Sequence, residues 1–276
     1  MLTDVTLPLA LFTGVAGMMA GVLGGMLGLG GGVFLVPFLV QGLGVPMPQA
    51  VAVSLTTVIA TSNALSASTA GRSAINMRLG FMLELLTALG GLLGSITAML
   101  VSPRALMITF SVVVTSMSVL TFLRRDVKNN LPADIDPGPW GGRFLDERLG
   151  ETVSYRVKRM PLAMATSFFA GNLSTLLGIG GGVVKVPVLT AWCGVPVRVA
   201  AATSAFMIGV TATSGALIYL GRGLLLPILA ASAVIGVRIG SNMGLKLGRQ
   251  LPPRLLKIVL AVVLLLVAIV MVSRLP

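Results

Sequence analysis

The sequence GLGGGVFLVP at residues 28–37 returns as GIGGGVVKVP at residues 178–187. The match continues without a gap through the Gly-Val-Pro triplets at 44–46 and 194–196. It ends at the Gly-Arg pairs at 71–72 and 221–222. Roughly 17 of about 45 aligned positions are identical, which is more than shared hydrophobicity alone would give. The chain therefore contains an internal duplication with an offset of about 150 residues.

Composition places the chain in a membrane. Of its 276 residues, 55% are hydrophobic and only 10% are charged, too few charges to cover a soluble domain. The segments of about ten alternating residues that mark a membrane β-barrel are missing. We therefore expect an all-α polytopic membrane protein. Stretches close to the roughly 20 apolar residues that cross a bilayer occur at 51–70, 83–101, 105–123, 199–220 and 258–272.

The segment plan predicts about five helical segments in each half. Residues 7–41 are apolar for too long to form one span, so the glycines at 28–32 indicate a helix, a break and a second, short helix. Residues 124–159 carry eight Lys/Arg and six Asp/Glu among several Pro and Gly, and we interpret them as a charged linker. The predicted domains are a first transmembrane repeat, 1–123, and a second, 160–276. In the second repeat we expect helices at 160–177, from the break at 178–182 to 193, and at 199–220, 224–247 and 254–272.

The basic residues predict an orientation. A formal charge of +12 suits nucleic acid, but the Lys and Arg side chains are scattered at segment ends without interleaved aromatic residues, so no nucleic-acid partner is expected. If the linker is cytoplasmic, about fifteen of the twenty basic residues lie inside, as the positive-inside rule requires. Both termini then face the periplasm. An odd number of segments per half would place the two repeats in opposite orientations, related by a pseudo-twofold axis in the membrane plane.

The two glycine breaks are the first candidate site. A helix that starts after a break presents free backbone N–H groups and about half a positive charge, which attract anions. Two such starts, brought together by inverted symmetry, would form an anion site near the membrane midplane. The alternative is that the glycines only allow close helix packing, which we prefer for the runs at 17–25, 90–94 and 240–248. The predicted substrate-binding glycines are Gly30, Gly31, Gly32, Gly180, Gly181 and Gly182.

Two basic residues fall within apolar segments. Lys185 replaces the repeat-related Leu35 three residues after Gly182. A lysine at membrane depth costs about 2.5–3.5 kcal/mol and indicates function, so we expect an anionic substrate as its partner. Arg238 is the second candidate. For both, the alternative is that the side chain snorkels to the membrane surface.

Neutral donors within the spans would suit a small oxyanion. The candidates are Ser54, Thr57, Asn63 and Ser204, and the duplication matches Ser54 with Ser204. Most Ser and Thr side chains in helices instead bond their own backbone. We therefore favour only the matched serines.

Other side chains offer little catalytic chemistry. Glu84 is the only acidic residue within a span, and its place near the end of that span favours a pair with Arg78. Without histidine or paired carboxylates, the spans give little support for a proton relay, for metal binding or for an enzyme, and no cofactor is expected. An anion that carries its own proton would need no relay. The single cysteine, Cys193, is interpreted as a buried, inert thiol.

The repeated Gly-x-Gly-Gly-Gly-x-x-x-x-Pro motif, followed by Gly-Val-Pro and a helix with Ser and Thr, resembles the TauE/SafE sulfite exporter family, also called the sulfonate uptake permease superfamily. The resemblance covers both halves. It implies a carrier of the bacterial inner membrane with two inverted repeats and a small sulfur-containing anion as substrate. The linker is longer and more charged than this resemblance implies.

We therefore predict a secondary transporter for sulfite or an organosulfonate, which moves the anion by rocking one repeat against the other. A permease for another organic anion, such as a carboxylate, and a passive anion channel remain as alternatives. A membrane enzyme is disfavoured. The expected partners are the small anion and the lipid bilayer; direction of transport, coupling ion and oligomeric state stay open.

Overall fold

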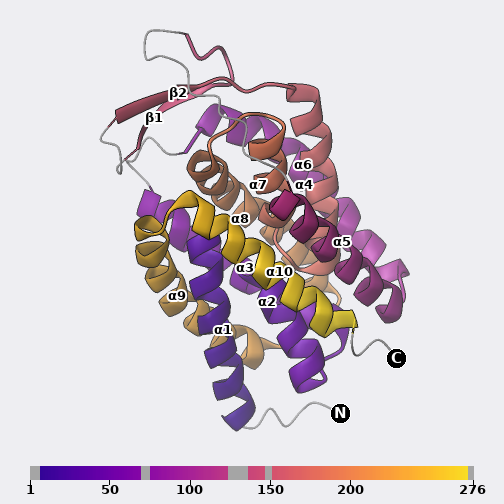
Figure 1. Ribbon diagram of the computed structural model, residues 1–276. Coiled ribbons are helices and arrows are strands. Elements are labelled where there is room, and N and C mark those ends of the chain that lie inside the picture. Colours follow the sequence, from indigo (N-terminus) through magenta and orange to yellow (C-terminus); the bar gives the residue numbers. More distant parts are fainter. Residues whose placement is uncertain (1–6, 70–74, 124–135, 147–150, 273–276) are drawn as a thin grey trace.

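The computed structural model describes residues 7–69, 75–123, 136–146, 151–272. These form two sets of helices separated by a small β-hairpin (Figure 1). The first set is α1 (Leu7–Leu27), α2 (Gly32–Pro37) continued by the π-helix η1 (Phe38–Gly42), α3 (Met47–Thr69), α4 (Met77–Leu100) and α5 (Pro103–Leu123). The hairpin is β1 (Gly142–Asp146) and β2 (Glu151–Tyr155). The second set is α6 (Met160–Leu177), α7 (Gly182–Ala191), α8 (Val197–Gly221), α9 (Pro227–Gln250) and α10 (Pro253–Val272).

The helix boundaries confirm the predicted break in each half. Helix α1 ends at Leu27 and α2 begins at Gly32, while α6 ends at Leu177 and α7 begins at Gly182. At Gly28 and Gly178 the backbone has φ of 72° and 68°, a left-handed conformation that glycine adopts without steric cost and that commonly ends a helix. The expected five helical segments per half are present, counting η1 as the continuation of α2.

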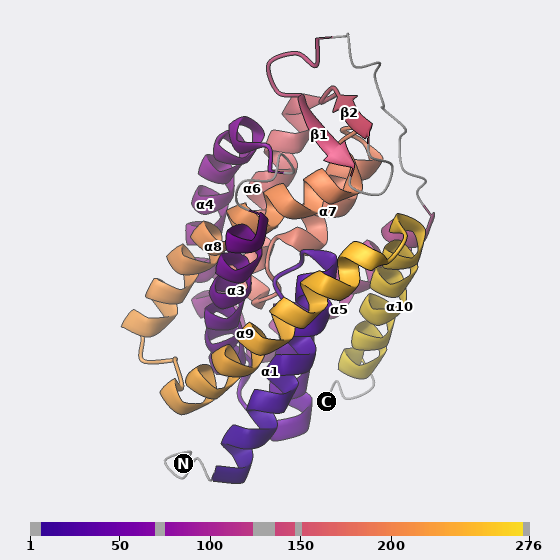
Figure 2. The same ribbon diagram turned by 90° about the vertical axis from the view of Figure 1, so that its left-hand side faces the viewer.

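The long helices of each half pair with helices of the other half (Figures 1 and 2). Helix α1 lies along α9, and α6 lies along α4, which are equivalent pairs under the duplication. The middle helices α3 and α8 contact each other, as do α5 and α10. Each half thus completes its packing with helices from the other. The described start of α1 and end of α10 lie at the end of the molecule opposite the hairpin.

Small residues allow the close approach of these crossed helices, as predicted for the glycine runs. On α1, Gly21 faces the backbone of Val237, and on α9, Gly240 faces the carbonyl of Met18 so closely that a Cβ at either position would overlap it. Gly90 and Gly94 of α4 face the carbonyls of Phe168 and Asn172 on α6 in the same way. Backbone-to-backbone contact of this kind is typical of helix packing in membranes.

We expect Gly94→Val to destabilise the fold. The added side chain would overlap the Asn172 carbonyl and lie against Thr175 Oγ1, and overpacking of this kind costs about 1–3 kcal/mol. Lower expression and a lower unfolding temperature in detergent would be measured against Gly221→Val, because no atom lies within 4 Å of a Cβ at Gly221. Equal unfolding temperatures for the two variants would contradict the packing role of this glycine.

Among the described residues, six helices are long and apolar enough to cross a bilayer: α1, α3, α4, α5, α8 and α9. Large apolar side chains cover their outer faces, and Phe122, for example, is 72% exposed. Apolar surface of this extent suits contact with lipid. Shorter apolar helical stretches lie at 32–42, 182–191 and 258–271.

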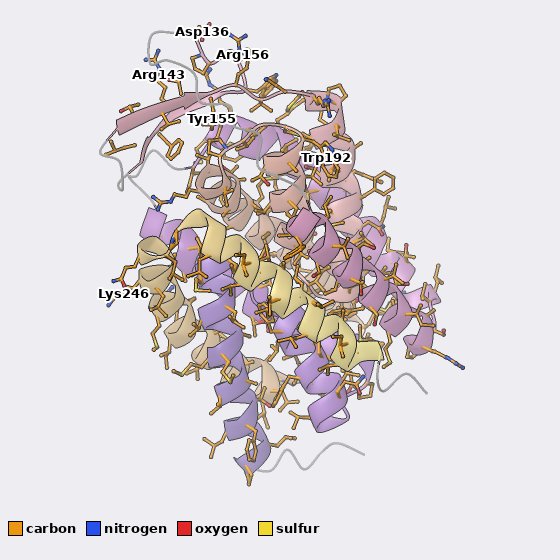
Figure 3. All side chains as sticks on the ribbon, in the orientation of Figure 1. Asp136, Arg143, Tyr155, Arg156, Trp192 and Lys246 are labelled. Carbon is orange, nitrogen blue, oxygen red and sulfur yellow. The ribbon has the colours of Figure 1, made fainter. Side chains whose placement is uncertain are left out.

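Part of the predicted linker is folded onto the helices. Strands β1 and β2 pair antiparallel, with Phe144 opposite Val153, and the Phe144 and Tyr155 rings meet edge to face at 6.4 Å. Both aromatic side chains are buried. Tyr155 lies on the helix side of the hairpin, whereas Arg143 and Arg156 lie on the side away from the helices (Figure 3). Basic residues of the linker at 124–135 and 147–150, and Arg72 before α4, lie outside the described residues.

Asn76 joins the hairpin to the helix bundle. Its Oδ1 accepts from the N–H of Leu79, which caps α4, while its Nδ2 donates to the hydroxyl of Tyr155 at 2.9 Å and to the Trp140 carbonyl at 2.9 Å. Its own backbone N–H donates to Thr203 Oγ1 on α8 at 3.0 Å. Burial raises the pKa of Tyr155 to about 12, so its hydroxyl stays protonated over the physiological range. One side chain therefore connects α4 with the hairpin.

We expect Asn76→Ala to loosen the hairpin from the bundle. The change removes a helix cap worth about 1 kcal/mol and leaves the Tyr155 hydroxyl without its donor. Hydrogen exchange of the β1–β2 amides should become faster, whereas Asn242→Ala, on the exposed face of α9, should leave it unchanged. Unchanged exchange in Asn76→Ala would show that the hairpin is held by its aromatic side chains alone.

The cysteine is buried, as predicted. Cys193 follows α7 and is fully buried, and its carbonyl accepts from the N–H of Lys158 after the hairpin at 2.9 Å. Burial raises the pKa of the Cys193 thiol to about 11, opposed by the charge of Arg159. The thiol is therefore almost entirely protonated at neutral pH.

Candidate functional site

The two glycine breaks lie against each other, as the inverted-site hypothesis requires. A Cβ on Gly32 would overlap the carbonyl oxygen of Gly178, and a Cβ on Gly182 would lie 2.9 Å from the carbonyl oxygen of Gly28. Helix α2 thus begins against the residue that follows α6, and α7 begins against the residue that follows α1. Contacts this close explain why Gly32 and Gly182 carry no side chain, without any need for a ligand.

Apolar side chains fill the space beside the breaks. The Val58 side chain, from α3, lies next to Gly30 and Gly32, and the Ile208 side chain, from α8, lies next to Gly180 and Gly182. Val58 and Ile208 are equivalent in the duplication. The junction is therefore lined by two matched apolar residues rather than by donors from both halves.

The matched serines have different surroundings. Ser54 Oγ donates to the Gly178 carbonyl at 2.6 Å, so it ties α3 to the opposite break. Ser204 is fully buried, and its hydroxyl has no hydrogen-bond partner among the described residues. Only the second-half serine therefore has a hydroxyl left for another group.

Lys185 forms an ion pair within the protein. Its ammonium lies 3.6 Å from Glu84 Oε2 on α4, and the lysine is 1% exposed. Thr211 Oγ1, on α8, donates to Glu84 Oε1 at 2.7 Å. The cluster thus draws one residue from each of α4, α7 and α8, and we call it the Lys185–Glu84–Thr211 cluster.

This pair corrects the prediction for Glu84. We expected a pair with Arg78, but Arg78 is exposed at the start of α4, whereas Glu84 points inward and is buried. The difference of six residues turns the two side chains to different faces of a helix with 3.6 residues per turn. The same contact argues against snorkelling of Lys185, since its ammonium is inside the bundle.

The Lys185 side chain turns back over the start of its own helix. A Cβ on Gly181, the N-cap of α7, would lie 3.3 Å from Lys185 Cε and 3.7 Å from Nζ. Side chains of helices tilt toward the N-terminus, and this tilt brings the ammonium to the start of α7, where the N–H groups of Val183 and Val184 already donate to the carbonyls of Gly180 and Gly181. Both charges there are positive, and an N-terminus disfavours a cation. An anion would relieve this repulsion.

The cluster and helix α6 both contain buried polar groups with bonding capacity left. Within the described part of the chain, Lys185 Nζ and Glu84 Oε2 make no hydrogen bond of good geometry, although they attract each other at 3.6 Å. Ser174 on α6, the helix that precedes the second break, is also fully buried with no partner for its hydroxyl among these residues. Buried polar groups are normally paired, so such atoms indicate places where a polar ligand can bind.

The remaining predicted residues lie elsewhere. The Thr57 hydroxyl donates to the Ser54 carbonyl of its own helix at 2.7 Å. This is the alternative stated above, in which a Thr in a helix bonds the backbone rather than a substrate. Asn63 lies on the exposed face of α3, and Arg238 on the exposed face of α9. The structure therefore brings Gly181, Gly182 and Lys185 together, and it separates Asn63 and Arg238 from them.

Gly31 and Gly181 are not equivalent in conformation, although the sequence aligns them. Gly31 has φ of 74°, and a Cβ on it would lie 2.8 Å from the Ala20 carbonyl. Gly181 has φ of −61°, which any residue can adopt. Gly31 is thus required by the backbone, whereas Gly181 is open to substitution.

Sequence reasoning missed Glu84 and Thr211 as parts of the site. A signal was available: Glu84 is the only acidic residue within a predicted span and Lys185 is one of two basic residues within apolar segments, and ionisable residues inside membranes commonly pair with each other. Neither charge is repeated in the other half, where Val234 and Leu35 stand instead. Among the described residues no group of three His, Cys, Asp or Glu could hold a metal ion.

Comparison with known proteins gives the following matches. The family model described as "Sulfite exporter TauE/SafE" matches residues 13–271. The chain is similar to the "Probable membrane transporter protein YunE" of Bacillus subtilis (strain 168), with 25% identity over 235 residues that cover 82% of this chain and 84% of the relative. No solved structure matches.

Proposed function

Because the chain belongs to the TauE/SafE sulfite exporter family and is a multi-pass membrane transporter, we propose that it carries a small sulfur-containing anion, sulfite or an organosulfonate. The transport is secondary and crosses the bacterial inner membrane. One observation carries the proposal: the buried ammonium of Lys185 lies at the N-terminus of α7, beside Gly181. A cation and a helix N-terminus at one buried point form a site for an anion.

The anion binds at the second glycine break. Its negative charge would be balanced by the Lys185 ammonium and by the positive end of the α7 dipole. The hydroxyls of Ser174 and Ser204 are candidates for neutral donors because both are buried without partners among the described residues. The first break contributes shape rather than charge, because Leu35 replaces Lys185 there. The site is therefore asymmetric although the repeats are matched.

The halves move as two inverted repeats. The crossed pairs α1 with α9 and α6 with α4 support a pseudo-twofold relation in the membrane plane. Rocking one repeat against the other about the junction of the breaks would expose the site alternately to each side. At this junction Gly32 packs against Gly178 and Gly182 packs against Gly28, so the two repeats are in close contact before the movement starts.

The hairpin end faces the cytoplasm in this proposal, and both termini face the periplasm. The excess of basic residues in the linker and at the ends of α9 and α10 near it supports this orientation. Reporter fusions test it: alkaline phosphatase fused within the linker should be inactive, and phosphatase fused after the C-terminus should be active. The reverse pattern would invert the topology.

A ligand screen tests the substrate class. The purified protein is heated with sulfite, thiosulfate, sulfate, taurine, sulfoacetate or small carboxylates, and its unfolding temperature is measured. A ligand at 100 times its dissociation constant stabilises by about 2.7 kcal/mol, so at least one sulfur-containing anion should raise the unfolding temperature. A shift with carboxylates alone would make the protein a permease for another organic anion.

Flux measurements in proteoliposomes distinguish a carrier from a passive anion channel or an enzyme. Uptake of the anion that binds should saturate, and unlabelled anion trapped inside should accelerate uptake of labelled anion. Flux without saturation or counterflow would indicate a channel. A chemically altered product that appears with the substrate would indicate an enzyme.

A further inference from the structure

The Lys185–Glu84–Thr211 cluster has a charge balance that limits how an anion can bind. With both side chains ionised, the pair is neutral and lies inside the bundle at 3.6 Å. A bound monovalent anion beside an ionised Glu84 would give the cluster a net negative charge. Uncompensated charge is costly in such a place, so the arriving anion needs an accompanying positive charge.

We propose that Glu84 takes up one proton when the anion binds Lys185, so that the protein is an anion–proton symporter. This inference rests on the proposed function and adds the coupling ion to it. A proton from the aqueous phase binds a carboxylate oxygen of Glu84, and Lys185 is freed to pair with the anion. On the other side of the membrane the anion leaves, the proton returns to water, and the Lys185–Glu84 pair forms again.

The geometry favours Oε2 as the oxygen that accepts the proton. Oε1 already accepts the hydrogen bond of Thr211 Oγ1 at 2.7 Å. Oε2 has no hydrogen-bond partner among the described residues and faces the ammonium. Thr211 thus positions the carboxylate, and the proton and the lysine compete for its other oxygen.

Charge balance also gives the conformational rule that symport needs. The empty cluster, with Lys185 and Glu84 both ionised, is neutral, and so is the cluster with anion and proton bound. Anion alone leaves a net charge of −1, and proton alone leaves +1. The site must close and lose water before it opens to the other side of the membrane, and this closed state disfavours net charge. Only the empty carrier and the carrier with anion and proton bound can therefore make the change.

Other ionisable groups near the cluster do not take this role. Helix α4 packs against α6 and α8, and α7 packs against α5, α6 and α8. The segment 160–177 of α6 contains no ionisable side chain. On α4, α5 and α8, the side chains exposed at helix ends are Arg78, Arg104 and Arg222. Arg198 lies in the first turn of α8, and the Tyr219 hydroxyl donates to the Thr175 carbonyl at 3.1 Å.

The first test measures protons bound with the anion. Sulfite is unsuitable because it takes up a proton itself near neutral pH, so the probes are methanesulfonate, isethionate, sulfoacetate and thiosulfate, whose charges stay constant between pH 6 and 8. In weak buffer with an indicator dye, the wild-type protein should take up about one proton per monovalent anion bound. Its apparent Kd should rise by up to about tenfold per pH unit where Glu84 is ionised in the free protein.

The second test uses Glu84→Gln, which keeps the acceptor for Thr211 and imitates the protonated side chain. This variant should bind the same probe with a Kd that is independent of pH, and without proton uptake. In proteoliposomes it should still exchange labelled for unlabelled anion but lose net uptake driven by a pH gradient, because its empty form carries the unpaired charge of Lys185. Arg78→Gln, an exposed change on the same helix, should behave as wild type.

The outcomes separate the two proposals. If no sulfur-containing probe, sulfite included, binds the wild-type protein, the proposed function fails and the coupling fails with it. Binding by the wild type without proton uptake overturns the coupling alone. Net uptake by Glu84→Gln that still follows the pH gradient does the same. If Glu84→Gln does not fold, the wild-type proton count decides by itself.

Discussion

Lys185→Met is expected to abolish anion binding and to make the protein less stable. At about 4 Å and an effective dielectric constant near 20, an ammonium attracts a monovalent anion by about 4 kcal/mol before desolvation, which leaves room for a loss of tenfold or more in affinity. The change also leaves Glu84 buried without its counter-ion. Breaking a buried ion pair on one side costs about 3–5 kcal/mol.

The double variant Lys185→Met with Glu84→Gln separates these effects. It removes both charges, so its unfolding temperature should recover much of the loss, whereas its anion binding should stay absent. Lys185→Arg retains the charge and should keep part of the affinity. Binding by Lys185→Met within twofold of wild type, measured by calorimetry, would remove this lysine from the site and leave the helix dipole and hydroxyls as the only donors.

The second large effect is expected at the glycine breaks, where Gly31→Ala and Gly181→Ala should behave differently. At Gly31 the left-handed backbone strains any side chain, by about 1–2 kcal/mol, and a Cβ would also press on the Ala20 carbonyl. We therefore expect Gly31→Ala to lower the unfolding temperature.

Gly181→Ala should fold normally and bind the anion more weakly. Its backbone is α-helical, and the nearest atom to the new methyl group is Lys185 Cε at 3.3 Å, which must move by a few tenths of an ångström. Affinity from the ligand screen and unfolding temperature without ligand are the two measurements. Wild-type affinity in Gly181→Ala would show that the anion does not depend on the position of the Lys185 side chain over this N-terminus.

Local patterns predicted much of the fold. Helix α6 was expected at 160–177 and is found there, and the second break begins and ends at the predicted glycines. The duplication carried this information, because a glycine cluster after an apolar run is visible twice. The short helix after the second break ends at Ala191 rather than at residue 193, within the usual uncertainty of helix ends.

The site depends on contacts that local patterns do not contain. Glu84 and Lys185 are about 100 residues apart in the sequence and meet because α4 and α7 both pack on α6 and α8. Asn63 was a candidate because it lies in an apolar span, but a helix that is apolar on all sides gives no sign of which face turns inward. The hairpin was missed because its strands have five residues each and lie within a charged stretch.

The single cysteine makes this chain a convenient background for chemical labelling. Burial raises the pKa of the Cys193 thiol to about 11, so very little of it is thiolate near neutral pH, and the thiolate is the form that reacts with maleimides. A cysteine introduced at an exposed helix end, such as Arg78 in the first half or Arg222 in the second, would react far faster. Labels for distance measurements between the two halves can therefore be attached without first removing the native thiol.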